Sequence, residues 1–165
     1  MNTAQFNREA VLAIVQADLA ELKRLAAASP KRRYRLCMHR SVEDATQEMV
    51  IVCRGDTVMP PHRHPIGRSE SYHIIEGTMT VCFFDNSGLV IRRLEMAPFG
   101  SGKPFLYRLS DSLWHAPVPT SDWLVYHETL TGPYAIDGVV EFPSWLPSGT
   151  SEAAIDHFLR LALRN

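Results

Sequence analysis

The sequence is poor in the features that mark several protein classes. Its 165 residues include only three cysteines, Cys37, Cys53 and Cys82. They are scattered and odd in number, so they predict neither a disulfide framework nor a metal site built on paired cysteines. Reduced thiols packed within strands are the expected role. Reduced cysteines in turn favour a cytoplasmic protein.

Neither sign of charge dominates, since 17 basic residues face 18 acidic ones and the formal net charge is −1. A balance of this kind argues against a nucleic-acid partner. No apolar run reaches the ~20 residues that a membrane-spanning helix needs. Residues 1–10 lack a basic start followed by an apolar stretch, so we expect no secretion signal and no membrane partner. Internal repeats and low-complexity segments are also missing.

Two amphipathic helices are predicted near the ends of the chain. The first covers residues 7–27, with Asn7 as its N-cap, and the Ser29–Pro30 pair ends it. Its apolar stripe consists of Leu12, Val15, Leu19, Leu22 and Ala26. The second follows Ser151 and carries Ile155, Phe158, Leu159 and Ala162 on one face. A single apolar face on each helix indicates that both pack on something larger.

Short segments rich in Val, Ile, Tyr, Phe and Thr occupy the middle of the chain. The predicted strands are residues 32–39, 46–54, 57–60, 70–76, 78–84, 89–95, 104–109, 113–118 and 122–130. Turn residues at Glu76-Gly77 and at 85–88 predict two hairpins. Many short strands without intervening helices are typical of an antiparallel sandwich or barrel.

We therefore expect one mainly β domain over residues 1–165. The N-terminal helix falls within residues 1–29, and the β-barrel spans residues 30–131. An irregular segment and the C-terminal helix occupy residues 132–165.

Four residues form a candidate metal site, namely His62, His64, Glu70 and His115. On a strand, two histidines two residues apart point to the same face. Glu70 begins the next predicted strand, and His115 lies far along the chain after a tryptophan. Imidazole and carboxylate ligands suit one divalent ion such as Fe, Ni, Mn, Zn or Cu. A histidine pair alone is often structural, so the prediction depends on all four residues in order.

This order resembles the motifs of the cupin superfamily. The first motif runs Gly, five residues, His-x-His, three or four residues, Glu, six residues, Gly; the second runs Pro-x-Gly-x-x-His. Here six residues separate Gly55 from His62, and five separate His64 from Glu70. Only the histidine of the second motif, His115, remains. The resemblance implies a single-domain cupin, a jelly-roll-type double-stranded β-barrel.

From residue 29 to about residue 149, the chain also resembles the WbuC-type cupin fold metalloproteins. The matching segments are residues 29–39, 61–65, 114–115, 128, 132–134 and 142–147. That family is associated with bacterial polysaccharide gene clusters, and its reaction is not established. The chain departs from it at Arg35, Cys37 and Pro60, so we expect its ligand specificity to differ.

A stripe of polar residues alternates along the first predicted strand, at Lys31, Arg33, Arg35, Cys37 and His39. A regular strand points all five to one face. One interpretation is a solvated edge strand whose charges oppose aggregation. In the other interpretation, the stripe lines the barrel mouth and binds an anionic or polyhydroxyl ligand, to which guanidinium groups are suited.

The candidate substrate-binding residues are Arg33, Arg35 and Tyr72, although Tyr72 also suits simple packing. Glu128 and His39 are the candidate catalytic residues. Glu128 matches the WbuC pattern, whereas its neighbour His127 points to the opposite strand face. As a general base or a partner of a histidine ligand, Glu128 would serve the site; the alternative is a salt bridge at a strand edge.

Two function classes follow. One is a metal-dependent enzyme acting on a small carbohydrate-related or anionic molecule, as an isomerase or epimerase, or as a dioxygenase with Fe or Mn. The other is a non-catalytic module that binds or senses a small molecule. A structural protein that has lost its metal is a third interpretation. By resemblance to cupins, a homodimer is expected.

Overall fold

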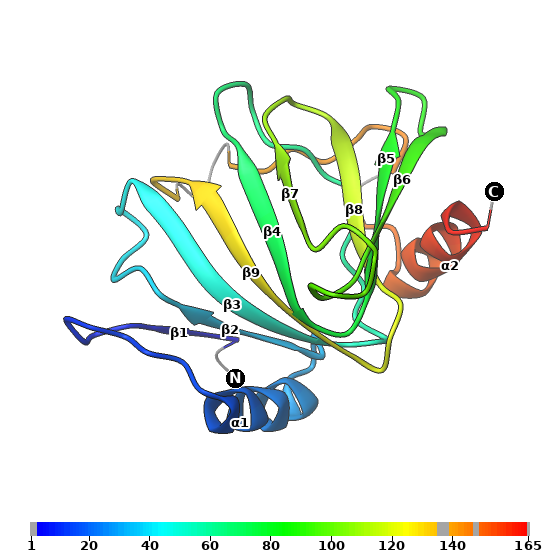
Figure 1. Cartoon of the computed structure of the whole chain (residues 1–165). Coiled ribbons are helices and arrows are strands. Elements are labelled where there is room, and N and C mark those ends of the chain that lie inside the picture. Colours follow the sequence, from blue (N-terminus) through cyan, green and yellow to red (C-terminus); the bar gives the residue numbers. More distant parts are fainter. Residues whose placement is uncertain (1–2, 135–138, 147–148, 165) are drawn as a thin grey trace.

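Two β-sheets face each other in the computed structural model, which describes residues 3–134, 139–146 and 149–164 (Figure 1). Across the larger sheet the strands are β1 (Ala4–Phe6), β2 (Arg33–Cys37), β3 (Thr46–Arg54), β9 (Trp123–Thr131), β4 (Glu70–Glu76) and β7 (Leu106–Leu109). The smaller sheet contains β6 (Val90–Met96), β5 (Met79–Phe84) and β8 (Trp114–Pro119). Both sheets pair strands that are distant in sequence, and only β1 pairs in parallel. This confirms the predicted jelly-roll-type fold class.

One predicted strand and one predicted hairpin do not form. Residues 57–60 form no strand, since consecutive prolines at 60 and 61 lack the N–H groups that a ladder needs. The Glu76-Gly77 turn joins β4 to β5, which belong to different sheets, so it makes no hairpin. Gly77 is nevertheless required there, because its φ is +78° and a Cβ would overlap the carbonyl oxygen of Trp123.

Helix α1 (Gln16–Ala28) is shorter than predicted, because residues 7–15 are not helical. Asn7 caps no helix; its Oδ1 accepts a hydrogen bond from the N–H of Glu9 at 2.8 Å. Residues 4–6 form β1 and pair with β2, so the segment before the helix is held against the sheet. The helix begins where the carboxylate of Asp18 accepts from the N–H of Val15 at 2.7 Å.

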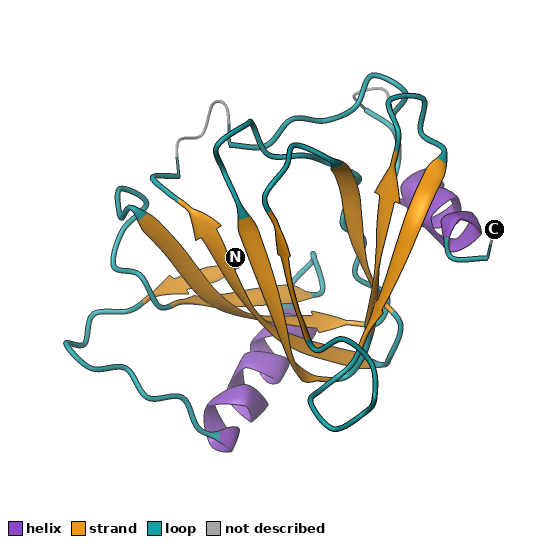
Figure 2. Cartoon of the chain, turned by 45° about the horizontal axis from the view of Figure 1, so that its top comes forward, coloured by secondary structure: helices purple, strands orange, loops and turns teal. Residues whose placement is uncertain are grey.

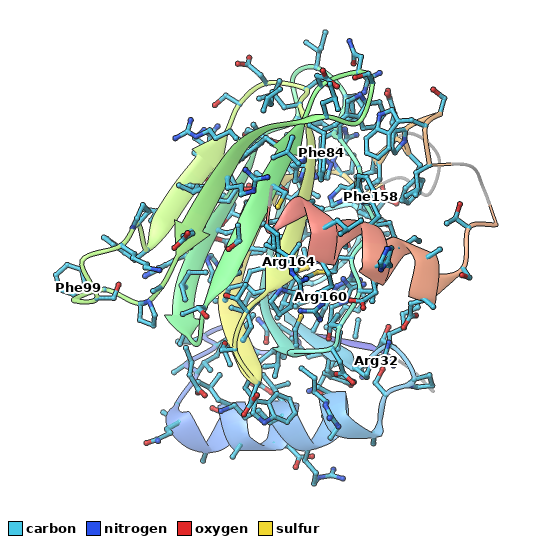
Figure 3. All side chains as sticks on the ribbon, turned by 90° about the vertical axis from the view of Figure 1, so that its right-hand side faces the viewer. Arg32, Phe84, Phe99, Phe158, Arg160 and Arg164 are labelled. Carbon is cyan, nitrogen blue, oxygen red and sulfur yellow. The ribbon has the colours of Figure 1, made fainter. Side chains whose placement is uncertain are left out.

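The two helices cover the outer faces of the two sheets (Figure 2). Helix α1 buries Leu22 and Ala26 in one apolar cluster with β2, β3 and β9. Helix α2 (Glu152–Ala162) begins at Ser151, whose hydroxyl accepts from the N–H of Ala154, as predicted. It packs Phe158 on Phe84 of the smaller sheet, with ring centroids 5.5 Å apart (Figure 3).

The central core lies between the inner faces of the sheets. Alternate residues of β3, β9, β4 and β5 supply it, including Ile51, Cys53, Leu124, Tyr126, Tyr72, Ile74, Val81 and Phe83. Side chains along a strand alternate between its two faces, so the residues that share a face with these core residues are the ones that can reach the interior. The three cysteines are free and buried.

Neither helix in the described part has the length and apolar character needed to cross a bilayer. The expected division of residues 1–165 at 30 and 132 remains a prediction, and its outer segments include residues outside the described part.

Candidate metal centre

The structure brings the four predicted metal ligands together. One ligand atom from each of His62, His64, Glu70 and His115 lies within 4.8 Å of all the others. His62 and His115 meet through two reciprocal backbone hydrogen bonds, of 2.9 and 2.8 Å. His62 thus lies in an isolated bridge to β8 and not in a regular strand. Convergence depends on that bridge and on Glu70 beginning β4, rather than on strand alternation alone.

Each imidazole is held by its Nδ1 atom against a backbone carbonyl oxygen. The three pairs are His62 with Pro60 at 2.9 Å, His64 with Val139 at 2.8 Å, and His115 with Leu113 at 2.9 Å. A carbonyl can only accept, so each Nδ1 carries the proton. In the neutral form of each ring, Nε2 then carries a lone pair, which is the usual state of a histidine ligand.

The Glu70 carboxylate is buried and held by two tyrosines. The Tyr72 hydroxyl donates to Oε2 at 3.0 Å, and the Tyr107 hydroxyl donates to Oε1 at 2.5 Å. The same oxygens lie 3.1 Å from Nε2 of His64 and 3.0 Å from Nε2 of His115. Both carboxylate oxygens are thus fixed in orientation beside the imidazoles.

This donor set fits a divalent cation. Nε2 of His115 is buried without a hydrogen bond in the described residues, since its approach to Glu70 falls outside hydrogen-bond geometry. A lone pair that faces a carboxylate is repelled unless a cation lies between them. Donor atoms each about 2.1 Å from one ion are at most roughly 4.2 Å apart, so the observed 4.8 Å requires only a small contraction.

The electrostatics favour the metal-binding forms of His62 and Glu70. Burial, with the neighbouring His115, lowers the pKa of His62 to about 3. Burial alone would raise the pKa of Glu70, but His115 and His64 outweigh it and hold that pKa well below its usual value. For His64, burial opposes a hydrogen bond to Glu70 and the net pKa is raised. His62 is therefore neutral and Glu70 ionised at neutral pH.

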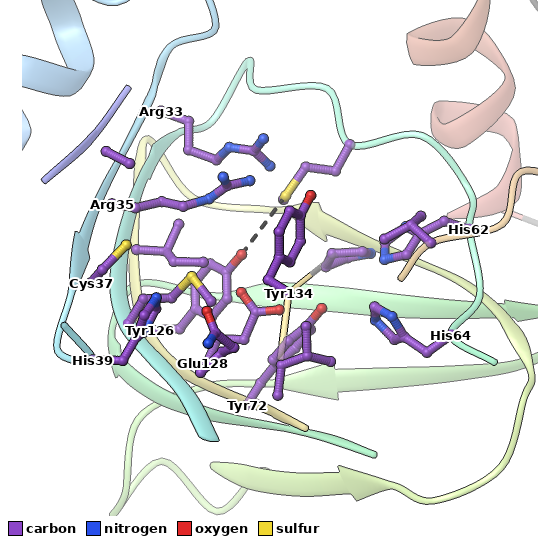
Figure 4. Close-up of a pocket in the computed structure, with 18 of the residues that line it drawn as sticks. Arg33, Arg35, Cys37, His39, His62, His64, Tyr72, Tyr126, Glu128 and Tyr134 are labelled. Atoms are coloured by element: carbon purple, nitrogen blue, oxygen red, sulfur yellow. Dashed lines mark hydrogen bonds between the residues drawn. The ribbon is translucent and has the colours of Figure 1, made fainter. Parts of the chain in front are cut away.

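A pocket of about 310 Å³ opens beside the centre (Figure 4). His62 and His64 line it on one side, and Arg33, Arg35, Cys37 and His39 of the predicted polar stripe line it on another. The interpretation of a solvated edge strand is wrong for Arg33, Arg35 and Cys37, because β2 lies between β1 and β3. Lys31 departs from the stripe, since it lies in an exposed turn before β2.

The other predicted site residues are placed by the strand register. Glu128 on β9 pairs with Tyr72 on β4, and both line the pocket. In the described residues Glu128 has no hydrogen bond or ion pair, so the alternative of a strand-edge salt bridge is wrong. Burial, then repulsion from Glu70, raises its pKa. His39 is buried, with Nδ1 2.9 Å from the carbonyl oxygen of Glu48.

Two supporting groups escaped the sequence interpretation. The contact of Tyr107 with Glu70 is not predicted by the sequence, because nothing local shows that β7 pairs with β4. The carbonyl of Val139, which holds His64, lies in an irregular segment with no readable pattern. Tyr134 and Tyr126 also line the pocket, and the Tyr126 hydroxyl lies 3.8 Å from Sδ of Met59. Alternation along the last strand was the one signal that could have placed Tyr126 inside.

Residues 14–96, about half the chain, match a family model described as a domain of unknown function (DUF6016). The chain belongs to this family. A search of curated proteins finds no match. The description of the family model does not name the WbuC type, and that finer resemblance remains a prediction for this DUF6016 protein.

Solved structures extend the similarity at the level of the fold. A structural-genomics protein from Shewanella oneidensis shares 10% identity, with 82% of this chain and 85% of that chain covered and a TM-score of 0.57. The capsular polysaccharide assembling protein CapF from Staphylococcus aureus shares 12% identity over 67% of this chain and 31% of its own, with a TM-score of 0.51.

A Cupin_2 domain from an XRE family transcriptional regulator of Enterobacter cloacae shares 14% identity, with 55% and 84% covered. Its TM-score is 0.42. The strand order and the two facing sheets of this chain form a jelly-roll-type fold, and the His/Glu cluster can hold a metal ion.

Proposed function

We propose that this DUF6016 protein is a metal-dependent cupin enzyme that moves a proton on a small metabolite, as an isomerase or epimerase does. The observation that carries the proposal is a combination. Three imidazole Nε2 atoms and one carboxylate border a pocket into which β9, the neighbour of β4, presents an unpaired carboxylate, Glu128. Buried carboxylates with raised pKa values are typical general bases.

His62, His64, Glu70 and His115 would hold the ion, one of Fe, Ni, Mn, Zn or Cu. When bound, it would act as a Lewis acid on a substrate oxygen. Tyr72 and Tyr107 keep the carboxylate of Glu70 in a fixed orientation. Glu128 takes a proton from a substrate carbon or hydroxyl group, and its raised pKa lets it return that proton. His39 is the second candidate for holding a proton in the same pocket.

The substrate class and cellular setting are proposals of the same kind. The resemblance to WbuC-type proteins supports a carbohydrate-related substrate, as does the fold similarity to CapF, a capsular polysaccharide assembling protein. A cytoplasmic location and a homodimer complete it.

Elemental analysis of protein purified without chelator tests the metal. We expect about one divalent ion per chain, lost in Glu70→Gln and His115→Ala. His73→Ala is the matched control, because His73 is exposed on the outer face. Thermal unfolding of each variant separates loss of metal from loss of fold. A wild-type protein without metal above background contradicts the proposal.

Catalysis is tested by screening phosphorylated sugars, sugar acids and nucleotide sugars for solvent-proton exchange by NMR. We expect exchange into one substrate with wild-type protein and none with Glu128→Gln, while metal content is unchanged. Tight binding of a compound without exchange or turnover in either protein indicates a binding module and overturns the enzymatic proposal.

A further inference from the structure

The two arginines of β2 occupy a special place in the pocket. Arg33 and Arg35 lie on the same face of the strand, roughly 7 Å apart along it. Their register partners on β3 are Cys53 and Ile51, which are buried in the central core. The aliphatic parts of both arginine side chains therefore begin beside buried apolar residues. Figure 4 shows both guanidinium groups on the side of the pocket opposite His62 and His64.

Both guanidinium groups lack a charge partner. In the described part of the chain, neither makes a hydrogen bond or lies within ion-pair distance of a carboxylate. Nε of Arg35 is fully buried without a hydrogen bond. A buried donor that is left unpaired costs free energy, and a charged one costs more. The protein tolerates that cost at Arg35, beside the second unpaired guanidinium group of the pocket, that of Arg33.

The other arginines of the described residues either have a partner or lie in water. Five pair with a carboxylate, namely Arg24, Arg32, Arg54, Arg63 and Arg160. Arg40 donates to the backbone carbonyl oxygen of Glu9. Nε of Arg32 and Nη2 of Arg93 are buried without a hydrogen bond, but another nitrogen of each of these guanidinium groups has a partner. Arg68, Arg93 and Arg108 donate to carbonyl or hydroxyl oxygens. The remaining ones, Arg8, Arg92 and Arg164, are exposed to water. Among the arginines of the described residues, Arg33 and Arg35 alone are half-buried with no hydrogen bond or ion pair to their guanidinium groups.

The net charge of the site also favours an anionic ligand. Two guanidinium groups face a single pocket carboxylate, Glu128, which lies beyond ion-pair distance from both. A divalent ion with Glu70 adds one more positive charge. The occupied site would then carry two net positive charges with Glu128 ionised, and three with Glu128 protonated. Opposite charge is the way in which such a site attracts its ligand.

We infer that Arg33 and Arg35 bind an oxyanion of the substrate, a phosphate or a carboxylate, while its other end reaches the metal ligands. This inference rests on the proposed function, whose substrate class it narrows. Planar guanidinium forks match the oxygen geometry of both anions. The volume of about 310 Å³ is at the low end for ligand pockets, so the substrate is a small sugar phosphate or sugar acid.

Calorimetric titration tests the inference with inorganic phosphate, ribose 5-phosphate and gluconate as anionic probes, and neutral ribose as the reference. We expect wild-type protein to bind at least one anionic probe at least tenfold more tightly than ribose. Arg33→Gln and Arg35→Gln should each weaken that binding at least tenfold, and Arg33→Lys should restore only part of it. Arg92→Gln, on the exposed face of β6, should behave like wild type.

If only the phosphate compounds bind, the substrate is a phosphate ester. If only gluconate binds, the substrate is a carboxylic acid. Both outcomes support the inference. Equal affinity of both glutamine variants and wild type overturns it, as does a wild-type protein that prefers none of the anions to ribose. Loss of an unpaired charge should leave the melting temperature of each glutamine variant unchanged or raise it. A lower melting temperature would therefore identify a variant that binds less because it is less well folded.

Metal content and titrations after chelation separate this inference from the proposed function. Arginine-dependent anion binding in protein that never holds metal means that the proposed function fails and the anion site stands. If the protein holds about one metal ion per chain but anion binding does not change when either arginine is replaced, the inference fails and the proposed metal site stands.

Discussion

The hydroxyl of Tyr107 donates a 2.5 Å hydrogen bond to Oε1 of Glu70, across the β7–β4 pair and 37 residues along the chain. Tyr72 donates to the other oxygen from two residues away on the same strand. The two phenols hold a buried carboxylate at the start of β4, facing three imidazole nitrogens. A ligand oriented in this way loses less freedom when it binds a metal.

Tyr107→Phe removes one of these donors and nothing else of comparable size. We expect metal affinity to fall by about 10–100-fold, the usual effect of losing a group that orients a ligand. Competition with a chromophoric chelator measures it. Tyr34→Phe is the matched control, because Tyr34 is buried under α1, outside the pocket. Equal affinities of the two variants would show that Glu70 needs no such support.

Removal of the metal should destabilise the protein, because an ion that binds only the folded state stabilises it by mass action. Free metal at 100 times its Kd contributes about 2.7 kcal/mol. For a chain of this length we therefore expect chelation to lower Tm by about 5–10 °C. Calorimetry before and after chelation checks this, with re-addition of metal as the reversal. The Glu70→Gln variant should show no shift; a shift of the same size there would mean that the chelator acts elsewhere.

His62 should make the metal-free protein acid-sensitive. Its pKa is lowered by burial to about 3, whereas an unfolded chain titrates near 6.5. Between these values the unfolded state binds the extra proton, so the free energy of unfolding falls as pH falls. Each pH unit in the window is worth up to about 1.4 kcal/mol for one fully shifted group. Urea unfolding at about pH 7 and about pH 4.5 measures the slope.

His62→Gln should flatten that slope, while His157→Gln, on the exposed face of α2, should not. The raised pKa of His64 has the opposite sign: its stabilisation is complete below 6.5 and is lost as pH rises through the folded value. Both variants retain His64, so the difference between them isolates His62. An unchanged slope in His62→Gln contradicts the prediction.

Helix α2 offers a paired test of packing. Leu159 is 2% exposed against the smaller sheet, whereas Leu161 is 44% exposed on the same helix. Leu159→Ala should cost about 2–5 kcal/mol of unfolding free energy, from lost burial and the cavity left behind. Leu161→Ala should change stability by less than about 0.5 kcal/mol. Denaturant titrations provide both numbers, and similar costs would mean that α2 is not docked as described.

The sequence by itself determined the features that depend on neighbours along the chain. Alternating side chains placed β3 and β4 at residues 46–54 and 70–76, where the structure has them. The hydroxyl of Ser151 made the start of α2 readable. The order of His62, His64, Glu70 and His115 was enough to nominate a metal site, because ligand chemistry depends on residue type.

Only the tertiary structure decided what depends on which strands become neighbours. The same apolar spacing that predicted a helix from residue 7 fails before Gln16, because the start of the chain pairs with β2. The Glu76-Gly77 turn has hairpin chemistry, yet it crosses between sheets. Contacts such as Tyr107 with Glu70 arise from strand order, which is set by burying both sheets and both helices together. No local pattern records that long-range choice.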